Sequence, residues 1–225
     1  KLNTQLKGVV TKLNPAISQL RNKTEYIETL NLDIYSISNL MSIRLDTYDL
    51  EVNPILNLSS NKREIAIYKK IENAEAKRKN VGIYLDGKSY NLFSASNSIE
   101  IAFFIVLENA IKYSIENETI KITFKETEDR LTLTFMNWGI RPGDDEIKKL
   151  TDRNYRSRNV INRNVEEGRG IGLYLLNQIC SVNDIQLKIK LGNDNKYHNG
   201  YRYSPFFVEM KFDGMIQHED GMDDF

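Results

Sequence analysis

The chain has 225 residues, in which 31 Lys and Arg balance 31 Asp and Glu, so its formal net charge is zero. This balance excludes a strong general attraction to nucleic acid or to an anionic membrane, and the length allows one large or two small domains with a buried core. The one cysteine lies in an apolar run and no stretch approaches the roughly 18 apolar residues of a membrane span, so we expect a cytoplasmic protein with no membrane segment in this chain.

Residues 1–50 carry two apolar stripes at helical spacing. Leu6, Val10 and Leu13 belong to the first stripe, and Ile27 begins the second. We expect a hairpin of two amphipathic helices, which would leave apolar surface in water without a partner. Either the hairpin folds back as a cap on the same chain, or it forms half of a four-helix homodimer.

A proline and a Ser-Ser-Asn run predict a linker at residues 51–60, and residues 61–79 have the pattern of a charged amphipathic helix. Five later runs alternate between apolar and polar residues, as strands with one buried face do. They are residues 81–86, 120–125, 131–135, 185–191 and 206–212. We therefore expect an α+β fold, an α/β sandwich in which helices cover one face of a mixed sheet of about five strands.

Residues 97–114 predict an apolar helix whose last turns carry polar groups. Asn97 and Glu100 have the spacing of a helix-capping pair. Asn109 and Lys112 are three residues apart and share one helix face. A carboxamide oxygen suits a hard cation such as Mg²⁺, and an ammonium group can bind a phosphate. This face is either part of a nucleotide site or an ordinary helix surface.

Two glycine-containing segments follow this helix. Asn137 and Gly139 come just after the third alternating run, so we expect the Asn137 carboxamide at a strand end, where it can hydrogen-bond the edge of a base. Gly168, Gly170 and Gly172 alternate directly before a second apolar helix. Glycines let the backbone approach an anion, and a helix start offers free N–H groups. Such a run also occurs as a plain helix start.

In this order, the three segments resemble the motifs of the ATP-binding domain shared by gyrase, the heat-shock chaperone, sensor histidine kinases and mismatch-repair ATPases. The histidine-kinase branch is the most similar. Residues 107–114 resemble its asparagine box, Asn137-x-Gly139 its first glycine box, residues 168–173 its second, and residues 150–157 the start of its mobile ATP lid.

The resemblance implies a Bergerat-type α/β sandwich over residues 61–213, followed by an acidic tail over residues 214–225. It also implies that ATP and Mg²⁺ bind there, with Asn109 as the metal ligand and Lys112 on a phosphate. Tyr113 would lie along the adenine, or would simply pack between helix and sheet. The residues implied to bind the nucleotide are Asn109, Lys112, Tyr113, Asn137, Gly139, Arg156, Gly168, Gly170, Gly172 and Leu173.

Two arginines lie in the segment that resembles the lid. Arg156 and Arg158 either neutralise the γ-phosphate or are solvated charges. The first glycine box also departs from the family. Asn137 replaces the usual Asp, and its third glycine is missing. An Asn oxygen can still accept a hydrogen bond from the adenine amino group, without the added strength of a charge.

The chain departs from the family at two further positions. In the family's hairpin a Pro follows the phospho-accepting His by five residues, and if Pro15 matches that Pro, Val10 stands where the imidazole would be. The two histidines, His198 and His218, lie outside the hairpin. Ile105 stands four residues before Asn109, where gyrase-like proteins have a Glu and histidine kinases often have Asn. Ile105 can neither accept a proton nor orient water.

These observations predict the ATP- and Mg²⁺-binding module of a sensor-histidine-kinase-like signalling protein, with any phosphotransfer going to an acceptor outside this chain. A homodimer through the hairpin and a response-regulator-like or other protein partner would follow. The alternative is a pseudokinase that binds ATP as a conformational switch or dimeric scaffold. A scaffold without nucleotide is less consistent with Asn109, Lys112 and the three glycines, since packing does not require all of them.

Overall fold

The computed structural model describes three continuous stretches of the chain and a few isolated positions before them. The stretches are residues 62–76, 82–162 and 169–216, and the isolated positions lie between Lys23 and Val52.

The chain divides into two units, Lys1–Leu45 and Asp46–Phe225, and every helix and strand discussed here belongs to the second. Apart from the isolated positions, the hairpin expected over residues 1–50 and the linker after it lie outside the described residues. The same is true of Gly168 and of the tail from residue 217 onward.

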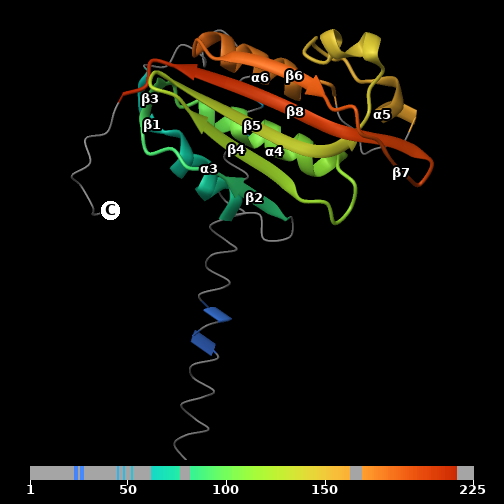
Figure 1. The fold of residues 1–225 in the computed structure, drawn as a ribbon, viewed down its shortest axis with the longest axis horizontal. Helices are drawn as coiled ribbons and strands as arrows, with labels where there is room; N and C mark the ends of the chain where they lie inside the picture. Colours follow the sequence, from blue (N-terminus) through green and yellow to red (C-terminus); the bar gives the residue numbers. More distant parts are fainter. Residues whose placement is uncertain are drawn as a thin grey trace, which may run out of the picture. The chain divides into compact units, whose positions relative to one another are not determined.

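The described part of the second unit is an α/β sandwich built on a mixed sheet (Figure 1). Its strands, in spatial order, are β2 (Ile83–Asp86), β4 (Ile120–Glu126), β5 (Arg130–Ile140), β8 (Tyr201–Asp213) and β6 (Gln186–Leu191). β2 runs parallel to β4, whereas the other neighbours are antiparallel. The predicted α+β fold is confirmed. The short strand β7 (Lys196–His198) pairs with β8 and lies outside the five alternating runs of the sequence.

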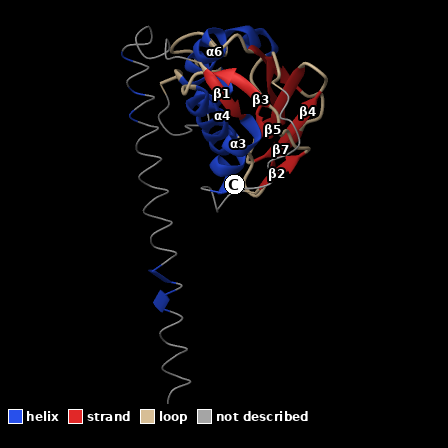
Figure 2. Cartoon of the chain, turned by 90° about the vertical axis from the view of Figure 1, so that its left-hand side faces the viewer, coloured by secondary structure: helices blue, strands red, loops and turns tan. Residues whose placement is uncertain are grey.

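Three helices cover one face of this sheet, as Figure 2 shows. They are α3 (Ile67–Ala76), α4 (Ile99–Tyr113) and α6 (Gly172–Val182). α4 is buried nearly all round, and inward strand residues such as Ile122, Leu133 and Met210 pack with it in one core. No helix in the described part of the chain is long and apolar enough to cross a membrane.

The pairing of β5 with β8 extends further than the sequence suggested. It runs from Arg130 opposite Asp213 to Ile140 opposite Tyr203. Asn137 therefore lies within a strand, and the prediction that it lies at a strand end was wrong. The apolar alternation stops at Phe135, because the next inward positions hold an amide and a glycine rather than apolar side chains.

The helix expected over residues 61–79 was also partly wrong. Arg63–Ala66 forms the strand β1, which pairs antiparallel with β3 (Leu92–Ala95), and α3 begins only at Ile67. Ile65 and Ile67 are both buried, and a spacing of two residues fits a strand as well as a helix stripe. The sequence pattern alone therefore did not distinguish a strand from a helix here.

The start of α4 differs from the predicted capping pair. The helix begins at Ile99, after a turn that includes Asn97 and Ser98. The backbone N–H groups of Ile99 and Glu100 donate to the carbonyl oxygens of Ser96 and Asn97, at 3.1 and 3.2 Å. Ser98, the N-cap residue, makes no side-chain capping bond. Backbone carbonyls therefore satisfy the donors that a side chain was expected to cap.

Candidate functional site

The last turns of α4 meet the first residue of α6 at Asn109. A β-carbon on Gly172 would lie 3.3 Å from Asn109 Nδ2 and 3.4 Å from Ile105 Cγ2. Asn109 Nδ2 is buried and has no hydrogen-bond partner among the described residues. Buried polar groups are nearly always hydrogen-bonded. The Asn109 amide nitrogen therefore needs an acceptor that the described protein groups do not supply. A residue larger than glycine at position 172 would crowd this carboxamide.

Ile105 forms the apolar wall of the same place. It is 5% exposed and lies against the position of Gly172. The side chain in this position is therefore unable to exchange a proton with a ligand or to hold a water molecule in line.

Gly170 contacts the backbone of Asn154 and Tyr155, which belong to the segment that resembles the start of the ATP lid. Its φ is +69°, and a β-carbon there would lie 2.5 Å from the carbonyl oxygen of Tyr155 and 2.7 Å from the carbonyl carbon of Asn154. Only glycine fits, since the backbone passes directly over it. Asn154 also has a positive φ, of 63°, which asparagine tolerates better than most residues.

Three predicted site residues lie in the last two turns of α4. After Asn109 come Lys112, whose Nζ lies 5.7 Å from the ring centroid of Tyr113, and Tyr113 itself. Burial raises the pKa of Tyr113, and the positive charge of Arg156 opposes this rise. Arg156 therefore lies close enough to act on the phenol. Tyr113 also packs, half-buried, against a small cluster that includes Ile140, which is the packing role considered above.

Asn137 connects the middle of β5 to the end of α4. It is 5% exposed, and its Nδ2 donates to Ser114 Oγ at 2.9 Å and more weakly to the carbonyl oxygen of Ala110 at 3.4 Å. Gly139 forms an isolated antiparallel bridge with Ser114. Since the amide nitrogen is engaged by the protein, the Asn137 carbonyl oxygen is the atom left for a ligand to use.

The sequence did not reveal Ser204. This residue lies opposite Gly139 on β8, is completely buried, and its Oγ has no hydrogen-bond partner among the residues described. One sequence signal could have found it: side chains at every second position of a strand share a face, and Ser204 lies six residues before the inward-facing Met210. Ser204 adds a second unsatisfied polar atom close to the Asn137–Gly139 segment.

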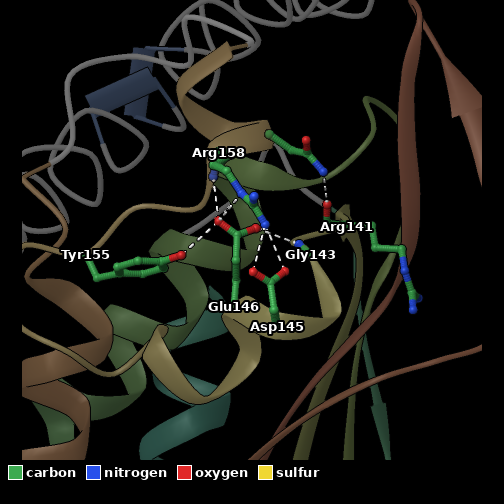
Figure 3. Close-up of polar contacts among 7 residues, drawn as sticks. Arg141, Gly143, Asp145, Glu146, Tyr155 and Arg158 are labelled. Carbon is green, nitrogen blue, oxygen red and sulfur yellow. Dashed lines mark hydrogen bonds and ion pairs between the residues drawn. The ribbon is translucent and has the colours of Figure 1, made fainter.

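The sequence also did not reveal Glu146, which lies in the 3-10 helix η1 (Asp144–Lys149) and is 2% exposed. Its Oε1 accepts hydrogen bonds from Tyr155 Oη at 2.8 Å and from the Arg158 backbone N–H at 2.9 Å, and its Oε2 accepts one from the Gly143 N–H at 2.6 Å (Figure 3). Burial favours a raised pKa for Glu146, but these bonds and the charge of Arg158 outweigh it, so the pKa lies below its usual range.

The Arg158 guanidinium is held in the same network. Its Nε lies 3.3 Å from Glu146 Oε1, and its Nη2 donates to both oxygens of Asp145, at 2.8 and 2.9 Å (Figure 3). Two carboxylates therefore neutralise this arginine, which begins the short helix α5 (Arg158–Asn162). In this structure the Arg158 guanidinium is therefore paired with acidic side chains of η1.

The described residues fit a magnesium nucleotide. No group of three or more His, Cys, Asp or Glu in the described stretches could hold a metal ion unaided. A cation here would therefore take most of its oxygens from phosphates and water, which is the usual mode of Mg²⁺ at nucleotides. Asn109 offers one protein oxygen ligand, Gly172 lies directly against Asn109, and Leu173 follows Gly172 in the first turn of α6, packed against the core.

The chain is similar to known proteins of one family. Residues 95–211 match the family described as "Histidine kinase-, DNA gyrase B-, and HSP90-like ATPase". The signal transduction histidine-protein kinase ArlS of Staphylococcus aureus (strain USA300) is 23% identical over 169 residues, which are 72% of this chain and 37% of that protein. The chain thus spans little more than a third of the length of the curated relatives it matches.

Two solved structures illustrate the likeness of fold. A mycobacterial sensor histidine kinase, MprB, superposes with a TM-score of 0.54 at 15% identity, covering 68% of this chain and 97% of that one. Full-length ShkA in complex with AMPPNP superposes with a TM-score of 0.53 at 12% identity, covering 76% of this chain and 36% of that one. At these identities the likeness concerns the fold alone.

Proposed function

This chain belongs to the family of histidine kinase-, DNA gyrase B- and HSP90-like ATPases, and we propose that it is the ATP- and Mg²⁺-binding catalytic module of a sensor-histidine-kinase-like signalling protein. Relatives such as ArlS are signal transduction histidine-protein kinases. Phosphotransfer would go to an acceptor outside this chain, since Val10 stands at the position matched to the acceptor His.

The contact between Gly172 and Asn109 carries the proposal. Asn109 Oδ1, an oxygen of the type that binds Mg²⁺, lies 3.7 Å from where a β-carbon of Gly172 would be, at the start of an 11-residue helix. The free N–H groups and positive dipole end of that helix favour phosphate. The solved complex of ShkA with AMPPNP, an ATP analogue, supports a nucleotide ligand for this fold.

The remaining residues take roles that suit their chemistry. Lys112 would bind a phosphate, and the Asn137 carbonyl oxygen would accept a hydrogen bond from the adenine amino group. Gly170 and Gly172 would let the backbone follow the phosphates, with Gly168 and Leu173 completing the run. Mg²⁺, when bound, would neutralise phosphate charge, and Arg156 would add a positive charge near Tyr113.

A second candidate function is favoured by Ile105. A pseudokinase needs the nucleotide for its shape and not for its chemistry, and the apolar Ile105 wall beside Asn109 provides no group for proton exchange. In that case ATP would stabilise one arrangement of the molecule, and a partner would recognise that arrangement.

One assay separates these functions. The chain is incubated with γ-labelled ATP and Mg²⁺, alone and with candidate response regulators. Acid-labile, base-stable label would indicate phosphohistidine and support the kinase, whereas saturable binding without label would support the pseudokinase. If ATP does not raise the Tm even at millimolar concentration, nucleotide binding itself is refuted. Asn193→Ala, an exposed change between β6 and β7, is the matched control for substitutions of Asn109.

The proposed module is cytoplasmic, forms a homodimer through the hairpin of residues 1–50, and signals to a response-regulator-like or other protein partner. The apolar stripes of the hairpin support this assembly. Light scattering of a chain without residues 1–50 should show a monomer that still binds ATP. A dimer in that experiment would place the interface elsewhere.

A further inference from the structure

We propose that Glu146 is a positioning residue for nucleotide binding, which acts by holding residues 155–158 (the arch) so that Arg156 stays beside the nucleotide site. Glu146 acts through the arch and not by touching the ligand. The inference rests on the proposed ATP-binding function and adds a residue that none of the family motifs identified above contains.

Both ends of the arch are held by one carboxylate. Glu146 Oε1 accepts hydrogen bonds from the side chain of Tyr155 at 2.8 Å and from the backbone N–H of Arg158 at 2.9 Å (Figure 3). Only Arg156 and Ser157 lie between these two anchors, and Ser157 is buried. The backbone that carries the Arg156 side chain is therefore fixed at both sides by the same group.

The other side of the arch rests on the glycine run. The Tyr155 carbonyl oxygen would lie 2.5 Å from a β-carbon on Gly170, two residues before α6 begins at Gly172. Burial raises the pKa of Tyr113, and the Arg156 charge acts in the opposite direction on the same phenol. The arch thus links η1 to the glycine run, and a shift of the arch would move Arg156 relative to both.

The network requires an ionised carboxylate. Glu146 accepts from three N–H groups and one O–H, those of Gly143, Arg158 (backbone N and Nε) and Tyr155. Of the neighbouring acids, Asp145 binds Arg158 Nη2 and Asp144 binds Arg141. A glutamine at position 146 would replace one acceptor oxygen by a donor, so at least one end of the arch would lose its anchor.

The test compares the Mg·ATP affinity of the 225-residue chain and of its variants by titration calorimetry. We expect Glu146→Gln to weaken binding about tenfold, the effect of losing a hydrogen bond to a charged group. Arg156→Ala should weaken binding as well. In the double variant, Glu146→Gln should cause no further loss, because it acts only through Arg156.

Glu209→Gln is the matched control. Glu209 is another largely buried carboxylate, bonded to Lys190 Nζ at 2.6 Å on the sheet, and its loss should leave Mg·ATP affinity unchanged. The inference is overturned if Glu146→Gln binds as tightly as the parent chain, if its effect adds to that of Arg156→Ala, or if Glu209→Gln weakens binding equally.

Tyr155→Phe keeps the inference testable if Glu146→Gln does not fold. It removes one anchor of the arch and should weaken binding about threefold, again without effect in the Arg156→Ala background. Additive losses would overturn the inference. A parent chain that does not bind Mg·ATP would refute the proposed function itself, which separates the two failures.

Discussion

Two polar regions of this domain differ in how completely their hydrogen bonds are satisfied. At Asn109, a buried amide nitrogen has no hydrogen-bond partner among the described residues. Around Glu146, one buried carboxylate accepts four hydrogen bonds from three residues. Buried polar atoms without partners are destabilising, so the first region has the character of a binding site. In the second region the carboxylate is fully hydrogen-bonded without a ligand, so this region has a structural role.

The difference predicts where substitutions change nucleotide affinity and where they change the stability of the free protein. In the region around Asn109, substitutions should alter nucleotide affinity with little effect on the free protein. In the region around Glu146 and Gly170, they should alter the stability of the free protein first. The predictions below test this separation, beginning with the largest expected effect.

Gly170→Ala should be the most disruptive change. The new β-carbon would lie 2.5 Å from the Tyr155 carbonyl oxygen, at a φ of +69°. We expect the free energy of unfolding to fall by about 3 kcal/mol, the sum of the left-handed backbone penalty and the overlap. Urea denaturation measures the change.

Gly200→Ala provides the control for this prediction. Gly200 also has a positive φ, of +78°, but a β-carbon there would meet nothing within 4 Å. It should cost only about 1 kcal/mol, for the backbone conformation alone. Equal losses in the two variants would show that the contact between Gly170 and the arch contributes nothing.

Asn109→Ala should affect binding and not folding. Removing a buried amide nitrogen without a partner leaves the stability of the free protein within about 0.5 kcal/mol of the parent. We expect Mg·ATP affinity to fall about a hundredfold, or about 2.7 kcal/mol. Titration calorimetry and the ATP-induced rise in Tm measure the two effects separately.

Asn183→Ala should show the opposite behaviour. The Asn183 side chain accepts from the Ser96 N–H at 2.6 Å and donates to the Ile179 carbonyl oxygen at 2.8 Å. Its loss should destabilise the free protein by about 2 kcal/mol and leave ATP affinity unchanged. If Asn109→Ala destabilises the free protein as much as Asn183→Ala does, the region around Asn109 is structural and the comparison fails.

The two regions were also unequally predictable from sequence. Asn109, Lys112 and the glycine run were identified because each belongs to a local pattern, a helix face or a glycine spacing, and the structure places Gly172 against Asn109. The inclusion of Asn137 in β5 was missed, because a strand continued by an amide and a glycine has no apolar alternation. It depends on pairing with β8, more than sixty residues away in the chain.

Glu146 could not be recognised from sequence. It follows two other acidic residues, Asp144 and Asp145, in what looks like an exposed acidic run. Only the third is buried, because Tyr155 and Arg158, nine and twelve residues later, return to it. No local pattern distinguishes a carboxylate that will be enclosed by a later loop from one that stays in water. Ser204 was missed for a similar reason, since its burial depends on the strand opposite.

Acid should weaken the region around Glu146, whose carboxylate must be ionised, and should not affect the Asn109 carboxamide, which does not titrate. The pKa of Glu146 is raised by burial but lowered more by hydrogen bonds from Arg158, Gly143 and Tyr155, so its net shift is downward. Its stabilising contribution is therefore complete above the unfolded pKa, about 4.3, and is lost as pH falls through the lower folded pKa.

Urea denaturation at pH 7, 5, 4 and 3 tests this smallest effect. The free energy of unfolding of Glu146→Gln should be lower than that of the parent at pH 7 and should fall less steeply below pH 5. Glu209 has a lowered pKa too, through its hydrogen bond to Lys190, so Glu209→Gln should also reduce the slope while leaving ATP affinity intact. Parallel pH profiles for the parent and Glu146→Gln would mean that the ionised carboxylate does not hold the arch, and the contrast between a supporting region and a binding region would lose its electrostatic basis.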